Sequence, residues 1–275
     1  MKRYLTIILL SILPYTVWCD NVSEGVMDNI RYMINYDTQE AFVIRNGNLY
    51  SGNIIIPEKV WDIYTVVGIG GRYSECLFDY YTTEVDIPAS VRTIKYNVFN
   101  GCYNLKKVNI HDLESWMSCT FNSNPLEYGA DLFLNGEKVT KVVVPRNFKM
   151  KNKFYGCNSI DSVEIHDSVS CTGFSGLENL RHVSISDGCT FPGGSAFSYC
   201  PLLTSAGPKG SGCAIEYDFK NIIPKNFLDA NNNLKELRIP SNIVKIENYA
   251  FNTERLENIY IEAEVPPTVN EEPFL

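Results

Sequence analysis

Apolar residues spaced three positions apart recur along the chain, and each group ends in a short segment that alternates apolar and polar residues. The clearest group is Phe99, Cys102, Leu105 and Val108. Three further groups keep this spacing: Phe154, Cys157, Ile160, Val163; Phe174, Leu177, Leu180, Val183; and Phe197, Cys200, Leu203, Ala206. Looser groups follow with one residue more (Phe227, Ala230, Leu234, Leu237) or one fewer (Phe251, Leu256, Ile259), and a degenerate first group has Cys76 in the Phe position. The pattern therefore indicates an internal repeat.

The residues that close these groups set the period of the repeat. They are Val85, Val108, Val142, Val163, Val183, Ala206, Leu237 and Ile259. Five of the intervals are 20–23 residues long, and the other two, of 34 and 31 residues, are one period plus an insertion. Periods of 20–29 residues are typical of leucine-rich repeats. Each turn of such a stack leaves its apolar side uncovered, so its stability depends on its neighbours.

The alternating segments predict short strands with one buried face, because successive side chains of a strand point to opposite sides. Examples are "VDI", "VNI", "VEI", "LRI" and "IYI". Stacked turns would join these strands into a parallel sheet, and the spacing of three predicts tight helical turns that face inward. We expect a β-rich solenoid over residues 20–275, with an N-terminal strand-rich cap near 26–66.

Two insertions are expected near 114–139 and 207–224. The first contains Asn135-Gly136 between two apolar alternations, which predicts a β-hairpin because both residues tolerate positive φ. The second begins with "GPKGSG", lacks the Gly-Lys-Ser/Thr sequence of a phosphate-binding loop, and is expected to turn into an extra strand.

The N-terminus has the features of a signal peptide over residues 1–19. Lys2 and Arg3 precede an apolar run from Tyr4 to Leu13, which is too short to span a bilayer. Two alternatives are a lipid-anchored Cys19, which bulky Trp18 disfavours, and a buried N-terminal helix. Cleavage would leave 22 basic and 32 acidic residues, a net charge of −10. Such a charge opposes nonspecific binding to nucleic acid or anionic membrane.

The chain contains nine cysteines, and their places in the repeat decide how most of them are interpreted. Cys102, Cys157 and Cys200 occupy a position that holds Leu177 and Ala230 in other turns, so this position selects for apolar volume. Buried free cysteine behaves as a small hydrophobe, and we interpret these three as core residues. A disulfide among Cys119, Cys171, Cys189 and Cys213 stays open, because spacing does not assign one.

The sequence contains no catalytic, metal-binding or cofactor-binding motif. His111 and His166 follow strands at the position that proline takes in other turns, which makes them corner residues. No Cys-x2-Cys, His-Glu-x2-His or Gly-x-Ser-x-Gly pattern is present. We therefore expect no metal, no cofactor and no enzymatic activity; an exported hydrolase on a repeat scaffold is a weaker alternative.

The outward positions of the predicted strands form the candidate binding face. They carry both charge signs and no aromatic stripe, which also suits a merely solvated sheet. The candidate residues are Glu84, Asp86, Lys107, Asn109, Ser162, Glu164, His182, Ser184, Glu236, Arg238, Asn258 and Tyr260.

The segment "VDIPASVRTIKYNVFNGCYNLKKVNI" resembles the repeat of the BspA-like leucine-rich repeat proteins of bacterial surfaces. The segment "SWMSCTFNSNPLEYGADLFLNGEKVTKVVVP" is similar to an insertion common in that family, and "EVPPTV" to a Pro-Pro element near the end of many such domains. The part "FVIRNGNLYSGNIIIPEKV…YTVVGIG" resembles their capping module. The resemblance implies a right-handed solenoid, no enzymatic activity, and binding or adhesion at the cell surface. The family defines no fixed binding residues.

The functional hypothesis is a secreted or surface-exposed bacterial protein that binds an extracellular or host protein or glycan. It involves neither nucleic acid nor membrane insertion after signal cleavage. The alternative is a structural spacer, or a fragment of a larger surface protein, without a ligand of its own. The ending "EEPFL", where another turn would begin, motivates this alternative.

Overall fold

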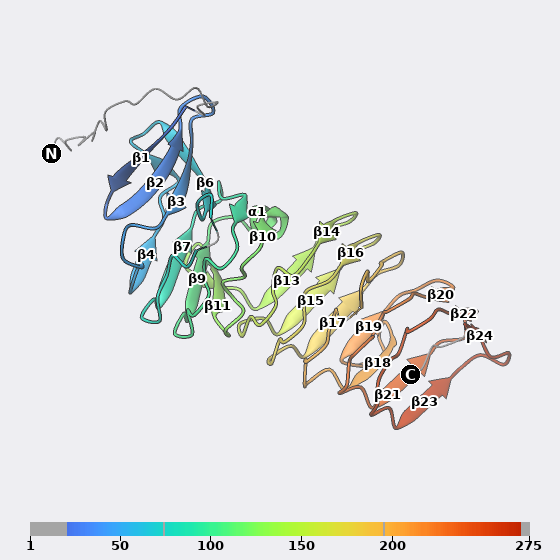
Figure 1. Cartoon of the computed structure of the whole chain (residues 1–275). Helices are drawn as coiled ribbons and strands as arrows, with labels where there is room; N and C mark the ends of the chain where they lie inside the picture. Colours follow the sequence, from blue (N-terminus) through green and yellow to red (C-terminus); the bar gives the residue numbers. More distant parts are fainter. Residues whose placement is uncertain (1–20, 74, 195, 271–275) are drawn as a thin grey trace.

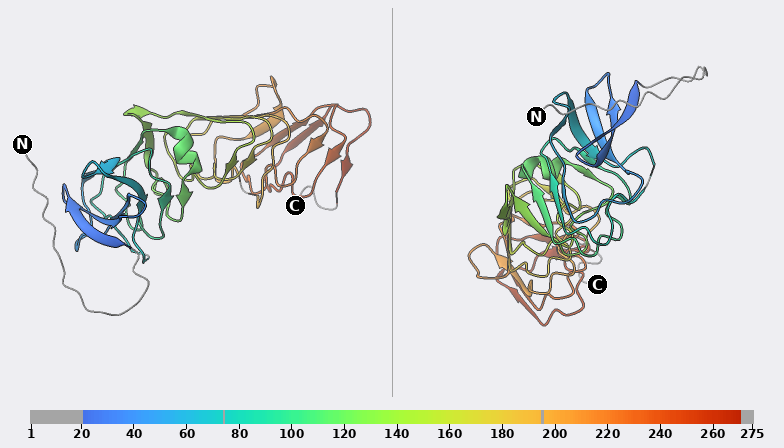
Figure 2. Two further views of the ribbon diagram at one scale, coloured as in Figure 1. Left: turned by 90° about the horizontal axis from the view of Figure 1, so that it is seen from above. Right: turned by 90° about the vertical axis from the view of Figure 1, so that its left-hand side faces the viewer.

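The computed structural model describes residues 21–73, 75–194 and 196–270. It shows an elongated stack of β-strand turns with a strand-rich cap at its N-terminal end (Figures 1 and 2). The predicted solenoid is therefore confirmed. The predicted signal peptide, including Cys19, lies outside the described residues.

The cap is an antiparallel meander that joins the solenoid edge to edge. It consists of β1 (Val22–Met27), β2 (Ile30–Asn35) and β3 (Glu40–Ile44), with β5 (Lys59–Val60) antiparallel to β6 (Tyr64–Ile69). From β3 onward the same sheet is parallel and continues through β6, β8 (Thr93–Ile94) and β10 (Thr120–Phe121). The first turns thus stack directly on the cap.

Two larger sheets carry the strands that close the repeats. The first has the order β12-β11-β9-β7-β4, and all its neighbours are parallel except the hairpin pair β11 and β12. Its strands are β4 (Asn53–Ile55), β7 (Glu84–Ile87), β9 (Lys107–Ile110), β11 (Asp131–Leu134) and β12 (Glu137–Lys138).

The second large sheet is parallel throughout, in the order β13-β15-β17-β19-β18-β21-β23. Its strands are β13 (Lys141–Val144), β15 (Ser162–Ile165), β17 (His182–Ile185), β18 (Ser205–Pro208), β19 (Ile215–Tyr217), β21 (Glu236–Ile239) and β23 (Asn258–Ile261).

Short strands form two small sheets elsewhere in the turns. One pairs β14 (Lys149–Met150) with β16 (Ser170–Cys171), and the other joins β20 (Ile222–Ile223), β22 (Lys245–Ile246) and β24 (Thr268–Val269). The described residues contain one α-helix, α1 (Leu113–Ser118). The tight turns expected to be helical are hydrogen-bonded turns instead.

The core consists of columns of equivalent side chains from successive turns. The closing residues Val85, Val108, Val142, Val163, Val183, Ala206 and Leu237 are all fully buried. Beside them, aromatic rings stack with nearly parallel planes: Phe154 and Phe174 lie 5.3 Å apart, and Phe174 and Phe197 lie 6.0 Å apart. Parallel pairing places identical positions over one another, which is why the columns form.

Cys102, Cys157 and Cys200 are fully buried, as predicted, and all eight described cysteines are free thiols. The turns around them are closed by bonds between residues three apart; the amide of Cys102 donates to Phe99 and that of Leu105 donates to Cys102. The cysteine position is therefore a core position of a tight turn.

Two residues were assigned to the wrong repeat position from the sequence spacing. In the first turn the ring of Phe78, not Cys76, continues the aromatic column, at 4.7 Å from the ring of Phe99. In the turn before β21 the cysteine position is held by fully buried Asn231, while Ala230 is partly exposed with φ of 58°. The extra residue of that turn shifts the spacing of three by one position.

The first expected insertion is largely a turn of ordinary length. Leu132 of β11 pairs in register with Val108 of β9, so helix α1 and β10 belong to a regular turn between them. The residues added beyond that turn are the β11–β12 hairpin, where Asn135 and Gly136 have φ of 51° and 86°. The predicted hairpin is confirmed.

The second insertion supplies the predicted extra strand, β19, which lies between β17 and β18. The loop 209–214 must therefore cross the outer face of β18 to bring the chain back. A Cβ on Gly207 would lie 2.8 Å from Ser211 Oγ and 2.9 Å from Cys213 Sγ. Glycine is required at this position because the loop packs against the bare backbone.

The stacked columns predict unequal effects of core truncation. Phe99→Ala should lower the free energy of unfolding by about 3–5 kcal/mol, because it removes a stacked ring and leaves a cavity. Cys102→Ala should lower it by only about 1 kcal/mol, since one sulfur-sized group is lost. Urea unfolding followed by circular dichroism measures both values. Equal losses for the two variants would contradict the assignment of these columns.

Candidate functional site: the outward faces of the parallel sheets

Strand alternation places the twelve candidate residues on the outer faces of the two large sheets. The register aligns them in rows: Glu84 with Lys107, and Asp86 with Asn109. The structure does not bring all twelve together. They form three groups, separated by the β11–β12 hairpin and by the loop 209–214 over β18.

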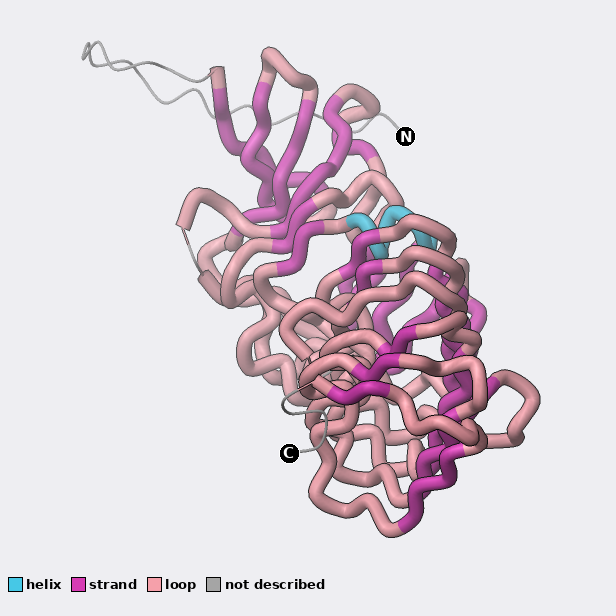
Figure 3. Tube along the Cα trace, turned by 90° about the vertical axis from the view of Figure 1, so that its right-hand side faces the viewer, coloured by secondary structure: helices cyan, strands magenta, loops and turns pink. Residues whose placement is uncertain are grey.

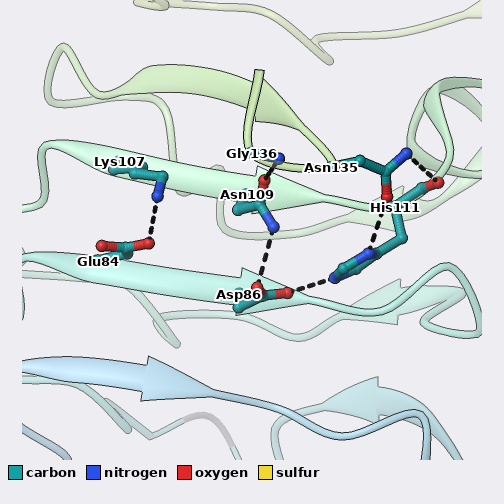
Figure 4. Close-up of polar contacts among 7 residues, drawn as sticks. All are labelled: Glu84, Asp86, Lys107, Asn109, His111, Asn135 and Gly136. Atoms are coloured by element: carbon teal, nitrogen blue, oxygen red, sulfur yellow. Dashed lines mark hydrogen bonds and ion pairs between the residues drawn. The ribbon is translucent and has the colours of Figure 1, made fainter. Parts of the chain in front are cut away.

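The first group is a polar ladder on β7, β9 and the hairpin (Figure 4). Lys107 Nζ lies 2.6 Å from Glu84 Oε1, and Asn109 Nδ2 donates to Asp86 Oδ2 at 2.9 Å. Asn109 is 6% exposed, and its Oδ1 accepts a hydrogen bond from the Gly136 amide at 2.8 Å. Asn109 therefore ties the hairpin to the sheet face.

His111 belongs to this ladder, although the sequence identified it only as a corner residue. Its Nε2 lies 2.6 Å from Asp86 Oδ1, and its Nδ1 lies 3.0 Å from Asn135 Oδ1 (Figure 4). The sequence did contain two hints of this contact, a histidine directly after a strand and the predicted Asn-Gly hairpin. The proximity of His111 to Asn135, however, depends on how the turns stack.

Lys107 has a second contact that the sequence did not indicate. Its ammonium group lies 5.0 Å from the center of the Phe133 ring on β11, and Asp131 on the same strand pairs with Lys138 at 2.8 Å. The charged groups of the first group are thus mostly satisfied within the protein.

The second group lies on β15 and β17 and centers on Glu164. Its carboxylate contacts Lys141 Nζ at 2.8 Å and His166 Nε2 at 3.0 Å. The hydrogen bond from Lys141 lowers the pKa of Glu164 below its usual range, and the hydrogen bond from His166 is the second-largest contribution to this lowering. Ser162, His182 and Ser184 lie beside it, half-buried.

The third group lies on β21 and β23. Arg238 Nε donates to Glu236 Oε1 at 2.7 Å, and its guanidinium group lies 5.5 Å from the center of the Tyr260 ring. Asn258 and Tyr260 are exposed. This is the most accessible of the three groups.

The described residues hold no group of three or more His, Cys, Asp or Glu side chains that could bind a metal ion. Beside α1 is a cavity of about 10 Å³, lined by Trp116 and Cys119 among others. That volume suits about one water molecule. Asp112 at its mouth caps the helix by accepting the Ser115 amide, which lowers the pKa of Asp112.

Lys153 is a buried cation that stabilises the other end of α1. Its ammonium group donates to the carbonyl of Cys119, the residue that caps the C-terminus of the helix, and lies 4.3 Å from the center of the Phe121 ring. Burial lowers the pKa of Lys153. A cation at a helix C-terminus is favourable, so this lysine has a structural role.

A family model described as the BspA type leucine-rich repeat region matches the chain in six copies, over residues 72–130, 113–222 and 150–271. No curated protein sequence matches the chain significantly. Among the described residues, no helix has both the length and the apolar character needed to cross a membrane.

Several solved structures similar to this chain are of proteins described as leucine-rich. A leucine-rich cell surface protein from Faecalibacterium prausnitzii is 17% identical, with 89% of this chain and 95% of the other covered and a TM-score of 0.31. A T. pallidum leucine-rich repeat protein is 15% identical (89% and 83% covered, TM-score 0.29). A leucine-rich repeat protein from Bacteroides ovatus is 16% identical (86% and 90% covered, TM-score 0.28).

The ladder predicts that Asn109 holds the hairpin in place. Asn109→Ala removes two hydrogen bonds and should lower the free energy of unfolding by about 1–2 kcal/mol. Hydrogen exchange of the Gly136 amide should become faster. Asn258→Ala, at an exposed asparagine of β23, is the matched control and should leave that amide unchanged. Equal Gly136 exchange in the wild type and in Asn109→Ala would contradict the assigned hydrogen bond.

Burial predicts that most thiols are chemically inert in the folded protein. It raises the pKa of Cys102 and of Cys119 to about 12 and that of Cys200 to about 11, so almost no reactive thiolate exists at pH 8. In a Cys19→Ala background, Ellman's reagent should label Cys76, the one described cysteine that is not buried, before the other seven. The fast phase should vanish in Cys76→Ser. A second fast thiol would contradict this burial pattern.

Proposed function

Because the chain belongs to the BspA-type leucine-rich repeat family, we propose that it is an exported, noncatalytic protein that binds proteins or glycans at the cell surface. The observation that carries this proposal is the in-register outward face, on which equivalent positions of successive turns recur as rows of polar side chains. Extended surfaces of this kind serve for binding in repeat proteins.

The internal pairing of the polar groups supports binding through a rigid surface. Lys107, Glu164 and Arg238 are each held by a partner on the protein itself, so little side-chain freedom is lost when a ligand docks. Preorganisation of this kind lowers the entropic cost of association. The mixture of charges favours a polar ligand that carries both donors and acceptors.

The second candidate function is a structural spacer. The same pairing favours it, because a face whose charges satisfy one another also needs no ligand. The two functions differ in whether a specific ligand exists, and a binding screen separates them.

The test is a screen of the purified protein against extracellular matrix proteins and glycan arrays, followed by substitution of the outward residues. Lys107→Glu, Glu164→Lys and Arg238→Glu should together weaken any ligand found by at least about tenfold in Kd. Lys151→Glu, an exposed lysine outside the large sheets, is the control for the change in charge.

Unchanged affinity in the triple variant would indicate that the ligand binds at the hairpin or at the loop 209–214 instead. The absence of any ligand would support the spacer. Turnover of a polysaccharide that is lost on changing one carboxylate would instead establish an enzyme.

A further inference from the structure

Strand β23 differs from every other strand of its sheet because its inward side chains are exposed. Ile259 and Ile261 are 44% and 46% exposed, whereas their register partners on β21, Leu237 and Ile239, are fully buried. These two isoleucines continue the buried columns by one layer, and no strand of the described residues follows to cover that layer. Figure 3 views the stack from this end.

The small sheet ends in the same way. Val269 of β24 is 54% exposed, whereas Ile246, its partner on β22, is buried. Val265, between β23 and β24, is 80% exposed. The last described turn therefore presents apolar side chains at the end of both sheets. Figure 1 shows its two strands, β23 and β24, at the C-terminal end of the stack. At the other end of the stack, the antiparallel strands of the cap cover the core.

The backbone edge of β23 is also open among the described residues. β23 is the last strand in the order of the large sheet, and β24 is the last in the small one. The outer edge of such a strand carries N–H and C=O groups that can pair with an added strand. Natural proteins usually cover an apolar edge of this kind.

The surroundings of this edge are acidic. Residues 241–270 contain five glutamates and two basic residues. Glu257 pairs with Lys235 and Glu247 pairs with Lys245, each at 3.4 Å. Glu262 and Glu264, directly after β23, form no ion pair with a described residue. A second copy of the chain would bring the same acidic groups together, and like charges across an interface disfavour association.

We propose that the β23 edge binds a β-strand from a partner polypeptide, with aliphatic side chains at alternate positions and lysine or arginine at its ends. The added strand would continue the parallel sheet through main-chain hydrogen bonds, the mode of β-strand addition. Its aliphatic residues would cover Ile259 and Ile261, and the basic residues at its C-terminal end would pair with Glu262 and Glu264, which follow β23. This surface adjoins the third outward group on the same strand, but it uses the backbone edge and the inward side chains of β23, and it goes beyond the proposed function.

The test uses two fluorescein-labelled peptides with the same core. The probe is Lys-Lys-Thr-Val-Thr-Val-Thr-Lys-Lys, and the control has Glu in place of all four Lys. Fluorescence anisotropy with the full chain should show saturable binding of the basic probe, with an affinity that falls as salt is added. The acidic control should bind at least about tenfold more weakly.

Variants locate the contact. Ile259→Ser with Ile261→Ser, and separately Glu262→Gln with Glu264→Gln, should each weaken the basic probe at least about tenfold. The glutamine pair should also reduce the dependence on salt. Ile55→Ser, at an exposed isoleucine of β4, is the matched control for the isoleucine pair and should leave the affinity unchanged. Hydrogen exchange should show the amides of Ile259 and Ile261 protected by the probe, because the Asn258 and Glu262 amides already donate to the β21 side.

Four results would overturn the proposal. They are an absence of binding, equal binding of the two peptides, loss of binding in the Ile55 control, and concentration-dependent dimerisation of the protein alone that the Ile259→Ser, Ile261→Ser variant abolishes. The last result would identify a second copy as the occupant. Because all four positions at this edge are exposed, thermal unfolding of the variants should match the wild type.

Discussion

The structure depends on one constraint, which is that no turn of the chain can bury its own apolar side. A regular turn such as that of Phe154, Cys157 and Val163 contributes one ring, one smaller apolar side chain and one aliphatic closing residue, and these are buried only when neighbouring turns stack in register. Parallel pairing satisfies the backbone between turns and places equivalent side chains over one another. The rings of Phe154, Phe174 and Phe197 are an example, since their planes differ by only 6° between neighbours. The order of the columns and the alignment of the outward residues both follow from this stacking.

The same register organises the polar side of the sheets. A residue that points outward in one turn lies beside its equivalents in the next, so opposite charges at equivalent positions become ion pairs without any local sequence signal. Glu84 and Lys107 are 23 residues apart and pair at 2.6 Å. Where the repeat is interrupted, the polar rows are interrupted as well. The hairpin and the loop over Gly207 divide what would be one continuous face into three.

Stacking also makes the first and last turns of the described stack different from the turns between them. An inner turn has a neighbour on each side, whereas an end turn has only one. The cap solves this problem at the N-terminal end with antiparallel strands that pair with the first parallel turn. At the last described turn, Ile259 and Ile261 occupy positions that are buried in the inner turns, yet their side chains are exposed. The chemistry of a partner for that edge follows from this conflict and from the acidic residues around it.

The sequence by itself determined which side chains face inward, because that depends only on local spacing. The period, the burial of Cys102, the Asn135-Gly136 hairpin and the extra strand after residue 207 were predicted on this basis. The tertiary structure decided everything that depends on which turn lies beside which. Phe78, and not Cys76, holds the aromatic position of the first turn, and Asn231, and not Ala230, holds the cysteine position before β21. His111 contacts Asp86 and Asn135, which lie on neighbouring turns. Such contacts join residues 20 or more positions apart, and their geometry is set by the stacking of the turns, which no local pattern records.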